Sequence, residues 1–261
     1  MSAAGRALLH QFVIPAYKES PFLGACLESL RAQTPASPIL VTTSTPSAFI
    51  DCVAAGSGAT VIANPGREGI AADWNFALGA THARYVTLAH QDDLYFPGFT
   101  EESLRLLKAS GAPVCFTGYE QVDDKGAAMT SKISRVKHLI EATTLGAGER
   151  PAPWRMRAFL SFGNPLPCSA VTYDRDQLAD FAFSDEFASN LDWEAWLRLH
   201  HLGKRFVRTP RRLVGRRHNP LTETSRLILD GRRAHEDALM FRQLWPRPIG
   251  AVLARLYRAG Y

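Results

Sequence analysis

Short apolar runs alternate with segments of helical apolar spacing over the first half of the chain. Proline, glycine or polar residues follow most of the runs, as expected at the ends of buried strands. We predict such strands over 11–16, 39–43, 59–63, 84–90 and 113–117. We predict helices from Ser20, a possible cap, to Leu30, and over 46–55, 69–81 and 97–110.

This alternation of strands and helices is typical of βαβ units, which build a mostly parallel central sheet flanked by helices. Right-handed crossovers then place the carboxyl ends of the first, second and fourth strands along one edge of that sheet. Ligands of open α/β sheets bind outside the carboxyl ends of the strands. We therefore expect an α/β fold whose site lies at this edge.

The second half of the chain follows a less regular pattern. The region 119–150 is polar and is expected to be irregular, with a hairpin turn at 123–126. Beyond it we predict a helix over 155–161, a strand over 167–173, an amphipathic helix over 191–201, short strands near Phe206 and Leu213, and helices over 222–244 and 248–259. We expect a main domain over 1–218 and a basic helical C-terminal extension over 219–261.

The chain of 261 residues is long enough to bury a large core as one domain with an appendage. It has no apolar run of the roughly 18 residues that span a bilayer, and it begins without a signal segment. Cys26, Cys52, Cys115 and Cys168 lie far apart in apolar segments, without a CxxC pair. We therefore expect reduced core cysteines and a cytoplasmic protein.

The net charge of +5 is concentrated near the C-terminus, where residues 203–261 hold one lysine and thirteen arginines against four acidic residues. Such a segment suits phosphates or anionic lipid, and it is equally typical of arginines that keep helices soluble. RNA-binding signatures are absent, so no nucleic acid partner is expected. Leu253, Leu256 and Tyr257 are spaced for one helical face, which either rests on the inner face of a membrane or docks on the core or a second subunit.

The strand predicted over 84–90 leads directly into four polar residues, His90, Gln91, Asp92 and Asp93. Two adjacent carboxylates and an imidazole at a strand end are suitable ligands for a divalent metal and the phosphates that it carries. A solvated turn is the alternative, because Asp-Asp pairs are common in turns and at helix caps.

Several pieces of the chain occur in an order that one family shares. They are Val13–Glu19, Asn64–Gly69 running into Asp73–Asn75, His90–Asp93, and Leu191–Leu199, with Arg217 and His218 near the end of the core. Together these pieces resemble the family 2 glycosyltransferases of GT-A fold, which pass a sugar from a nucleotide diphosphate donor with inversion. The resemblance covers residues 11–218 and implies a Rossmann-like GT-A fold.

The resemblance implies a divalent metal, Mn²⁺ or Mg²⁺, that bridges the phosphates of the donor. The last Asp of the family's D-x-D motif is a metal ligand; it matches Asp92, with Asp93 beside it. His218 matches the C-terminal histidine that completes the metal or pyrophosphate shell in many GT-A enzymes. His90 replaces the first Asp of the motif; a neutral imidazole can ligate Mn²⁺ or bond the ribose but adds no negative charge.

The resemblance also assigns donor-binding residues to the ends of the first two strands. Pro15, Tyr17 and Glu19 match the family's Pro-x-Tyr-x-Glu element, where the base and ribose would rest. At the end of the second strand, relatives carry an Asp that bonds the pyrimidine. Thr42 stands there in this chain, and a hydroxyl can replace one of those hydrogen bonds.

The glycine loop before the third helix supplies the next part of the expected donor site. Gly66, Arg67 and Gly69 match this loop, whose open backbone and helix N-terminus suit the diphosphate or the sugar. The other donor-binding residues that the resemblance implies are His90, Gln91 and Asp93.

Asp192 matches the Asp of the family's Glu-Asp pair, the base that takes the acceptor hydroxyl's proton as it attacks the anomeric carbon. This step needs a carboxylate opposite the leaving group, because inversion is an in-line displacement. Leu191 occupies the place of the usual Glu. An N-cap is the alternative role for Asp192, and Glu194 is a second candidate for the base.

These matches imply an inverting, metal-dependent hexosyltransferase. It would move a sugar from UDP, dTDP or GDP to a hydroxyl of a saccharide or lipid-linked saccharide, as in polysaccharide biosynthesis. A nucleotide-sugar-binding protein without catalysis is one alternative, because His90, Thr42 and Leu191 each replace an acidic residue. A nucleotidyltransferase is the other, although residues 17–21 lack its glycine-rich, Arg-Lys-containing signature.

Overall fold

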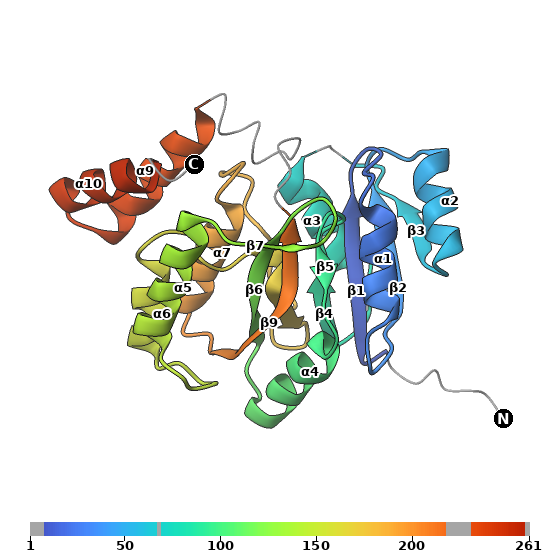
Figure 1. The fold of residues 1–261 in the computed structure, drawn as a ribbon, viewed down its shortest axis with the longest axis horizontal. Helices are drawn as coiled ribbons and strands as arrows, with labels where there is room; N and C mark the ends of the chain where they lie inside the picture. Colours follow the sequence, from blue (N-terminus) through green and yellow to red (C-terminus); the bar gives the residue numbers. More distant parts are fainter. Residues whose placement is uncertain (1–7, 67–68, 218–230, 259–261) are drawn as a thin grey trace.

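The computed structural model describes residues 8–66, 69–217 and 231–258. The strands of these residues form one nine-stranded sheet, with helices around it and the two C-terminal helices at one end (Figure 1). The α/β prediction is therefore confirmed. The boundary expected at residue 218 falls outside the described residues, so the division into two domains stays a prediction.

The first half of the chain folds as the expected alternation of strands and helices. Its elements are β1 (His10–Ala16), α1 (Leu23–Arg31), β2 (Ile39–Thr43), α2 (Ala48–Gly56), β3 (Thr60–Ala63), α3 (Ile70–Gly79), β4 (Tyr85–Leu88), β5 (Leu94–Tyr95) and α4 (Phe99–Ser110). Strands β2, β1 and β4 are parallel neighbours, which confirms that their carboxyl ends share an edge. Ser20 does not cap α1, whose N-cap position is Phe22, whereas the Ser47 side chain caps α2.

The second half adds antiparallel strands and most of the remaining helices. Its elements are β6 (Val114–Val122), β7 (Ala128–Met129), α5 (Lys132–Leu145), α6 (Pro153–Leu160), the 3₁₀ turn η1 (Cys168–Ala170), β8 (Val171–Asp174), α7 (Leu191–His201), β9 (Phe206–Arg217), α9 (Arg232–Leu244) and α10 (Arg247–Arg258). The strand order is β3-β2-β1-β4-β8-β6-β9-β5, with β7 on β6. Pairing is parallel from β3 to β4 and between β6 and β9.

The prediction of an irregular region over 119–150 is wrong. β6 continues to Val122, the turn at 123–126 forms as expected, and α5 follows from Lys132. Ser131 and Ser134 begin α5 with a reciprocal capping box. The sequence hides this start because serine replaces the usual Glu or Gln three residues after the cap.

The strands expected near Phe206 and Leu213 are a single strand, β9, with a bulge in its pairing with β6. Gly118 of β6 faces the bulge, and a Cβ at this position would lie 2.9 Å from the Pro210 carbonyl oxygen. The predicted strand over 167–173 begins instead with η1, and only Val171–Asp174 extends as β8. Cys26, Cys115 and Cys168 are buried free thiols as expected, but Cys52 is exposed.

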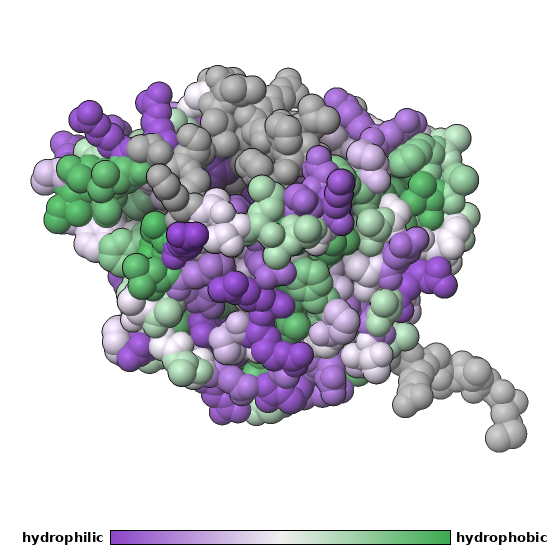
Figure 2. Space-filling model, in the orientation of Figure 1, coloured by the Kyte–Doolittle hydropathy of each residue, from purple (hydrophilic) through white to green (hydrophobic). Residues whose placement is uncertain are grey.

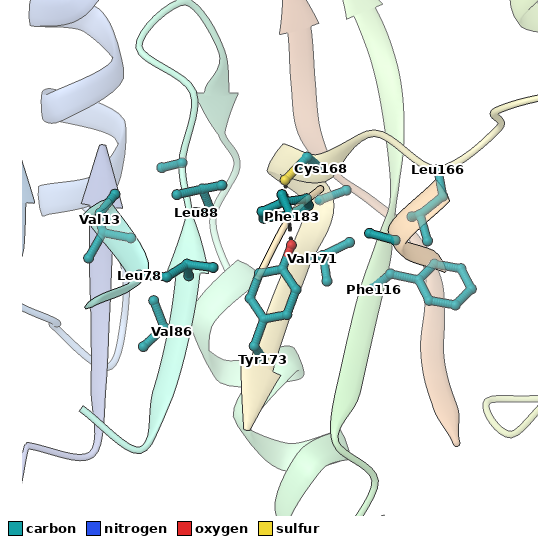
Figure 3. Packing of buried hydrophobic residues seen from close by; sticks show 14 of the residues in the cluster. Val13, Leu78, Val86, Leu88, Phe116, Leu166, Cys168, Val171, Tyr173 and Phe183 are labelled. Atoms are coloured by element: carbon teal, nitrogen blue, oxygen red, sulfur yellow. Dashed lines mark hydrogen bonds between the residues drawn. The ribbon is translucent and has the colours of Figure 1, made fainter. Parts of the chain in front are cut away.

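Helix α7 is anchored in the core by two fully buried indoles, Trp193 and Trp196. Their Nε1 groups donate to the carbonyls of Leu160, at 2.8 Å, and Leu166, at 3.1 Å. The core continues beneath α7 to β8, where Tyr173 points its hydroxyl at Cys168 (Figure 3). Because a buried indole needs one particular acceptor, this pair of bonds fixes the rotation of α7. It therefore fixes where Asp192 lies.

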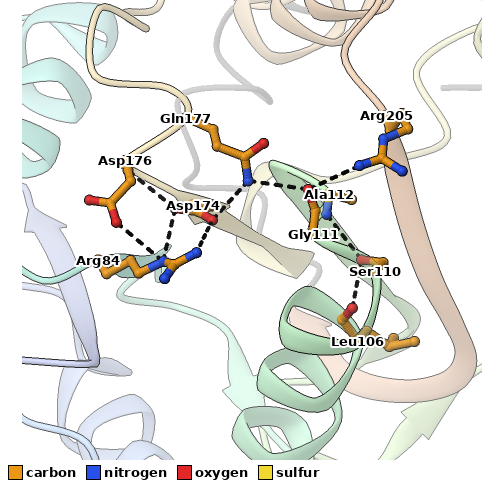
Figure 4. Close-up of polar contacts among 9 residues, drawn as sticks. All are labelled: Arg84, Leu106, Ser110, Gly111, Ala112, Asp174, Asp176, Gln177 and Arg205. Atoms are coloured by element: carbon orange, nitrogen blue, oxygen red, sulfur yellow. Dashed lines mark hydrogen bonds and ion pairs between the residues drawn. The ribbon is translucent and has the colours of Figure 1, made fainter.

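An ion-pair cluster closes the edge of the sheet where β4 begins and β8 ends (Figure 4). Arg84 pairs with the buried Asp174 at 3.1 Å and with Asp176 at 3.3 Å, and the Gly111 carbonyl accepts from Gln177 and Arg205. The site expected from the sequence lies at the other end of β4. This edge therefore offers control positions that are remote from the site.

The C-terminal helices pack against the rest of the molecule. Met240 and Phe241 of α9 belong to the main hydrophobic core, and Trp245 donates to the Ser161 carbonyl at 2.8 Å. Gly250 lets α10 pass close to α9, because a Cβ there would lie 2.9 Å from the Phe241 carbonyl oxygen. No helix among the described residues is both long and apolar enough to cross a membrane.

Candidate active site

A cluster of possible metal ligands lies just beyond the carboxyl end of β4. His90, Asp92 and Asp93 each offer a ligand atom, and these atoms all lie within 4.8 Å of one another. The closest His90–Asp93 approach is 3.9 Å, between Nδ1 and a carboxylate oxygen. The sequence placed these residues together, and the structure brings their ligand atoms together.

The chemistry of this cluster fits a divalent cation. Burial, followed by the charge of Asp92, raises the pKa of Asp93 to about 6. The buried Nε2 of His90 has no hydrogen-bond partner among the described residues. Carboxylates suit Mg²⁺ and Mn²⁺, and an imidazole is a better ligand for Mn²⁺ than for Mg²⁺. A cation would offset the repulsion between the two carboxylates.

Arg217 at the end of β9 holds the metal-ligand loop in place. Its backbone N–H donates to Asp93 at 3.0 Å, and its Nε donates to the Asp92 carbonyl at 3.0 Å. Its guanidinium lies 4.3 Å from the ring centre of Phe22. The sequence marked Arg217 only as a neighbour of His218, which lies outside the described residues.

Gln91 joins the loops that follow β1 and β4. Its amide oxygen accepts from the Tyr17 backbone N–H at 3.1 Å, and its amide nitrogen donates to the Tyr17 carbonyl at 3.0 Å. The next residue, Lys18, has a φ of 55°, which is uncommon for a residue with a side chain. Gln91 therefore fixes the backbone of Tyr17, and its expected contact with the donor stays a prediction.

The other residues expected at the first two strand ends differ in exposure. Pro15 and Tyr17 are partly buried and Glu19 is exposed beyond the strand. Thr42 is only 1% exposed and lies inside β2, paired with Pro15. A donor could therefore reach Tyr17 and Glu19 more readily than the Thr42 hydroxyl.

An acidic group does stand at the end of β2, and Asp73 of α3 supplies it. One of its carboxylate oxygens accepts from the Ser44 hydroxyl at 3.0 Å, and the other accepts from the Asn64 amide at 2.9 Å. Asn64 also accepts from the Gly66 N–H at 3.0 Å, which shapes the start of the glycine loop. The sequence offered Asp73 either as a group that reaches back to donor or acceptor or as a solvent-facing residue. The side chain is buried, and its contacts with Ser44 and Asn64 were not predicted.

The glycine loop ends at the N-terminus of α3. Gly69 is the N-cap residue and has a φ of 140°, a conformation in which side chains are strained. Arg67 lies outside the described residues, so its expected contact with the donor stays a prediction. Trp74 of α3 packs against His90, with ring centres 5.0 Å apart. Helix α3 thus borders the metal-ligand cluster.

Asp192 lies in the first turn of α7 and is partly exposed. It is not the N-cap, because Asn190 holds that position. One carboxylate oxygen of Asp192 accepts from the Trp193 N–H at 2.9 Å and from the Asn164 amide at 2.8 Å. The second candidate base, Glu194, is paired with Arg198 at 2.8 Å. The geometry therefore favours Asp192 over Glu194 as an available carboxylate.

The turn η1 lies beside β4, whose end carries the metal-ligand cluster, and Asn164 in the loop before η1 donates to Asp192. Burial raises the pKa of the Cys168 thiol, and the charges of Asp192 and Asp93 raise it further. Both carboxylates are therefore near Cys168, although they are far apart in the sequence. A carboxylate near a possible metal site is an arrangement that can combine proton removal with stabilisation of a leaving anion.

The segment before α7 is held by α9. Three consecutive backbone N–H groups, from Ala188, Ser189 and Asn190, donate to the carboxylate of Glu236 at 2.8 to 2.9 Å. The Asn190 amide also donates to Asp237 at 2.7 Å. The C-terminal helices therefore support the helix that carries Asp192, a role that the sequence did not indicate.

Several solved structures share this fold. S. aureus TarS 1–349 in complex with UDP-GlcNAc has a TM-score of 0.65 at 12% identity, over 94% of this chain and 70% of that one. The mannosyltransferase PcManGT from Pyrobaculum calidifontis, in complex with GDP-Man and Mn²⁺, has a TM-score of 0.64 at 14% identity, over 98% and 70%. Glucosyl-3-phosphoglycerate synthase from Mycobacterium tuberculosis, in complex with Mg²⁺ and UDP, has a TM-score of 0.56 at 18% identity, over 85% of this chain and 76% of that one.

The structural similarity shows the fold, and this chain spans only 42% of a longer TarS structure. No curated protein matches the chain in sequence. The model of "Glycosyl transferase family 2" matches residues 11–164, more than half of the chain, from β1 to beyond α6. The chain thus belongs to glycosyl transferase family 2 and is a glycosyltransferase of GT-A fold.

Proposed function

We propose that the protein transfers a sugar from a nucleoside diphosphate donor to an acceptor hydroxyl, with inversion at the anomeric carbon. The observation that carries this proposal is that Asp192 and the His90–Asp93 cluster both lie close to η1 and the loop that precedes it. The solved structures of the same fold add support, because five of them are complexes with UDP, UDP-GlcNAc or GDP-Man.

In the proposed reaction Asp192 acts as the base. Its carboxylate takes the proton from the acceptor hydroxyl while that oxygen forms a bond to the anomeric carbon. The bond from the anomeric carbon to the phosphate oxygen breaks, and its electron pair leaves with the diphosphate. The Asn164 amide and the Trp193 N–H both donate to one oxygen of this carboxylate and hold its orientation.

Asp92 and Asp93 would hold the metal, with His90 as a further ligand. A bound divalent metal supplies positive charge that stabilises the leaving diphosphate. We favour Mn²⁺, because the cluster includes an imidazole. The complexes of the same fold contain Mn²⁺ in PcManGT and Mg²⁺ in the M. tuberculosis enzyme. His218 stays a proposed ligand that lies outside the described residues.

The nucleoside would lie against the ends of β1 and β2. Tyr17 and Glu19 follow β1, and Asp73 offers at the end of β2 the acidic group that Thr42 lacks. The diphosphate would lie between the glycine loop of Gly66 and Gly69 and the metal-ligand cluster. Helix N-termini such as that of α3 favour anions.

Of the two alternatives, the family match favours glycosyl transfer over nucleotidyl transfer. Asp192 is partly exposed and both of its hydrogen bonds use the same carboxylate oxygen, so the other oxygen is left for an acceptor; this favours an active enzyme over a binding protein. We propose a saccharide or a lipid-linked saccharide as the acceptor, within polysaccharide biosynthesis.

A membrane surface is the proposed partner of α10. Ile249, Val252 and Leu256 are 46%, 58% and 66% exposed on one face of this helix, with Arg255 and Arg258 beside them. Figure 2 shows hydrophobic side chains gathered at the end of the molecule where α10 lies. Leu253 and Tyr257, which the sequence assigned to the same face as Leu256, pack against the core instead. An apolar face beside arginines suits anionic lipid.

Thermal unfolding with UDP, GDP and their sugars, each with and without Mn²⁺, tests the donor and metal assignments. We expect stabilisation by at least one nucleotide, greater with Mn²⁺, of about 2.7 kcal/mol at 100 times the dissociation constant. Asp92→Ala should abolish the metal-dependent part, and Asp176→Ala, at the remote edge of the sheet, should not. A Mn²⁺ effect that survives Asp92→Ala would contradict the metal assignment.

A further inference from the structure

Asn164, in the loop between α6 and η1, joins three separate elements. Its backbone N–H donates to the Tyr257 hydroxyl of α10 at 3.2 Å, and its backbone carbonyl accepts from the Lys137 ammonium of α5 at 3.1 Å. Its side-chain amide nitrogen donates to Asp192 of α7 at 2.8 Å. The backbone of Asn164 is thus held on two sides while its side chain meets the proposed base.

The chain passes very close to Tyr257 just before Asn164. Gly163 has a φ of 126°, and a Cβ at this position would overlap the Tyr257 ring. The same ring packs against Trp193 and Phe241, with ring centres 6.2 Å and 5.6 Å away. The Tyr257 ring therefore packs between α7, α9 and the Gly163 backbone, and this packing fixes the position of its hydroxyl.

Chemistry fixes the orientation of the Asn164 amide. An ionised carboxylate only accepts hydrogen bonds, so the amide must turn its NH₂ group toward Asp192. The amide oxygen is then left buried, without a partner among the described residues. A buried amide usually finds partners for both ends. The Asn164 amide oxygen is left without a hydrogen bond, while the amide NH₂ group donates to Asp192.

We propose that Asn164 is the positioning residue of Asp192, and that Tyr257 and Lys137 hold Asn164 in the position that this requires. This inference rests on the proposed function of Asp192 as the base. Asn164 sets the direction of the carboxylate, while α10 serves as a structural support of the active site. The C-terminal helices thereby contribute to catalysis through Asn164.

Turnover as a function of pH separates positioning from a purely structural role. The assay is release of nucleoside diphosphate from UDP-glucose, UDP-GlcNAc and GDP-mannose with Mn²⁺, with water as the acceptor. For Asn164→Ala we expect kcat to fall ~10-fold to 100-fold with little change in KM, and the acid limb of the pH profile to move away from that of the wild type. Tyr257→Phe should change kcat and the acid limb in the same direction as Asn164→Ala does, with kcat lower by about 3-fold to 10-fold.

Asn75→Ala is the matched control. Asn75 also makes two hydrogen bonds through its amide, but both reach the Phe183 backbone at 2.7 and 2.8 Å. Its substitution should leave the acid limb in place even if the protein becomes less stable. An acid limb that stays in place in both Asn164→Ala and Tyr257→Phe would overturn the positioning proposal.

A second readout does not require turnover. In ¹H–¹⁵N spectra the side-chain NH₂ of Asn164 should be protected from solvent exchange, should shift in Asp192→Asn and should exchange at least ~10-fold faster in Tyr257→Phe. Free exchange of this group in the wild type would overturn the proposal. Normal turnover by Asp192→Asn, with the Asn164 signal protected, would instead contradict the proposed function and leave the geometry standing.

Discussion

At the scale of single residues, the sequence predicted groups that lie close together along the chain, but not the contacts that join residues across it. His90, Asp92 and Asp93 follow one another, so their cluster was predictable from the strand that precedes them. Asn164 and Arg217 act through partners 28 and 124 residues away. A pattern in one sequence carries no signal for such contacts, so their roles appear only in the fold.

Lys137 gives a prediction about pH at this scale. Burial, and then the guanidiniums of Arg216 and Arg233, lower its pKa from 10.5 to about 7. Between these pH values the unfolded chain holds more protons than the folded chain, so this group makes the free energy of unfolding rise with pH. Below pH 7 both states are protonated, and the full cost of burying the charge remains.

Lys137→Met removes this titration while keeping a similar side-chain stem. We expect the variant to gain stability relative to the wild type at pH 7, and the difference to shrink as pH rises toward 10. Urea unfolding of both proteins at pH 7, 8, 9 and 10 measures this difference. A difference that is constant over this range would show that the lysine is not perturbed by burial.

At the scale of secondary structure, most elements followed from the apolar pattern, and the exceptions have physical causes. α7 was predicted over its full length, because its apolar positions repeat at helical spacing. α5 was missed because serine takes the place of the usual Glu or Gln in its capping box, and β9 was divided because a bulge interrupts its pairing with β6. The supporting role of α9 was not predictable, since it depends on docking rather than on propensity.

Glu236 of α9 is predicted to stabilise the segment before α7. Three backbone N–H groups donate to its carboxylate, and hydrogen bonds to charged groups contribute about 1.5–3 kcal/mol each. Glu236→Gln leaves one acceptor oxygen and turns an NH₂ group toward these donors. We expect the free energy of unfolding to fall by about 2–4 kcal/mol in urea titrations.

The matched control for this substitution is Glu186→Gln, because Glu186 is exposed in the same segment. Hydrogen exchange of the Ala188, Ser189 and Asn190 amides should become faster in Glu236→Gln and stay unchanged in Glu186→Gln. Equal exchange rates in the two variants would contradict the role of α9 as a support for α7.

At the scale of the whole molecule, the α/β class and the parallel edge were predictable, because βαβ units follow from local patterns. The insertion of antiparallel β8 between β4 and β6 was not, since it pairs strands that are distant in sequence. This insertion brings η1, and with it the loop of Asn164, next to the end of β4. The active site thus combines the end of β4, which the sequence predicts, with η1 and its preceding loop, which only the fold brings there.

The exposed face of α10 leads to a prediction about the whole molecule. The protein should bind vesicles that contain anionic lipid more tightly than neutral vesicles, and salt should weaken this binding. Replacing Ile249, Val252 and Leu256 with glutamate should lower the bound fraction at least ~10-fold in co-sedimentation, because these side chains would enter the membrane interface.

Leu202→Glu combined with Ile62→Glu is the control, since both residues are exposed and apolar but lie on other elements. Binding should persist in this double variant. If the α10 variant binds vesicles as well as the control does, the proposed membrane surface is wrong. Self-association that disappears in the α10 variant would assign this face to a second copy of the chain instead.

The central claim is that Asp192 is the base of a nucleotide-sugar glycosyltransferase. Its most direct test is the rate of nucleoside diphosphate release from UDP-glucose, UDP-GlcNAc or GDP-mannose with Mn²⁺, in the wild type, Asp192→Asn and Asp176→Asn. We expect Asp192→Asn to lower the rate on the order of 100-fold or more, with calorimetric affinity for the donor retained and Asp176→Asn near the wild type. An Asp192→Asn enzyme that keeps the wild-type rate, or a wild type that binds a donor but never releases the diphosphate, would contradict the account.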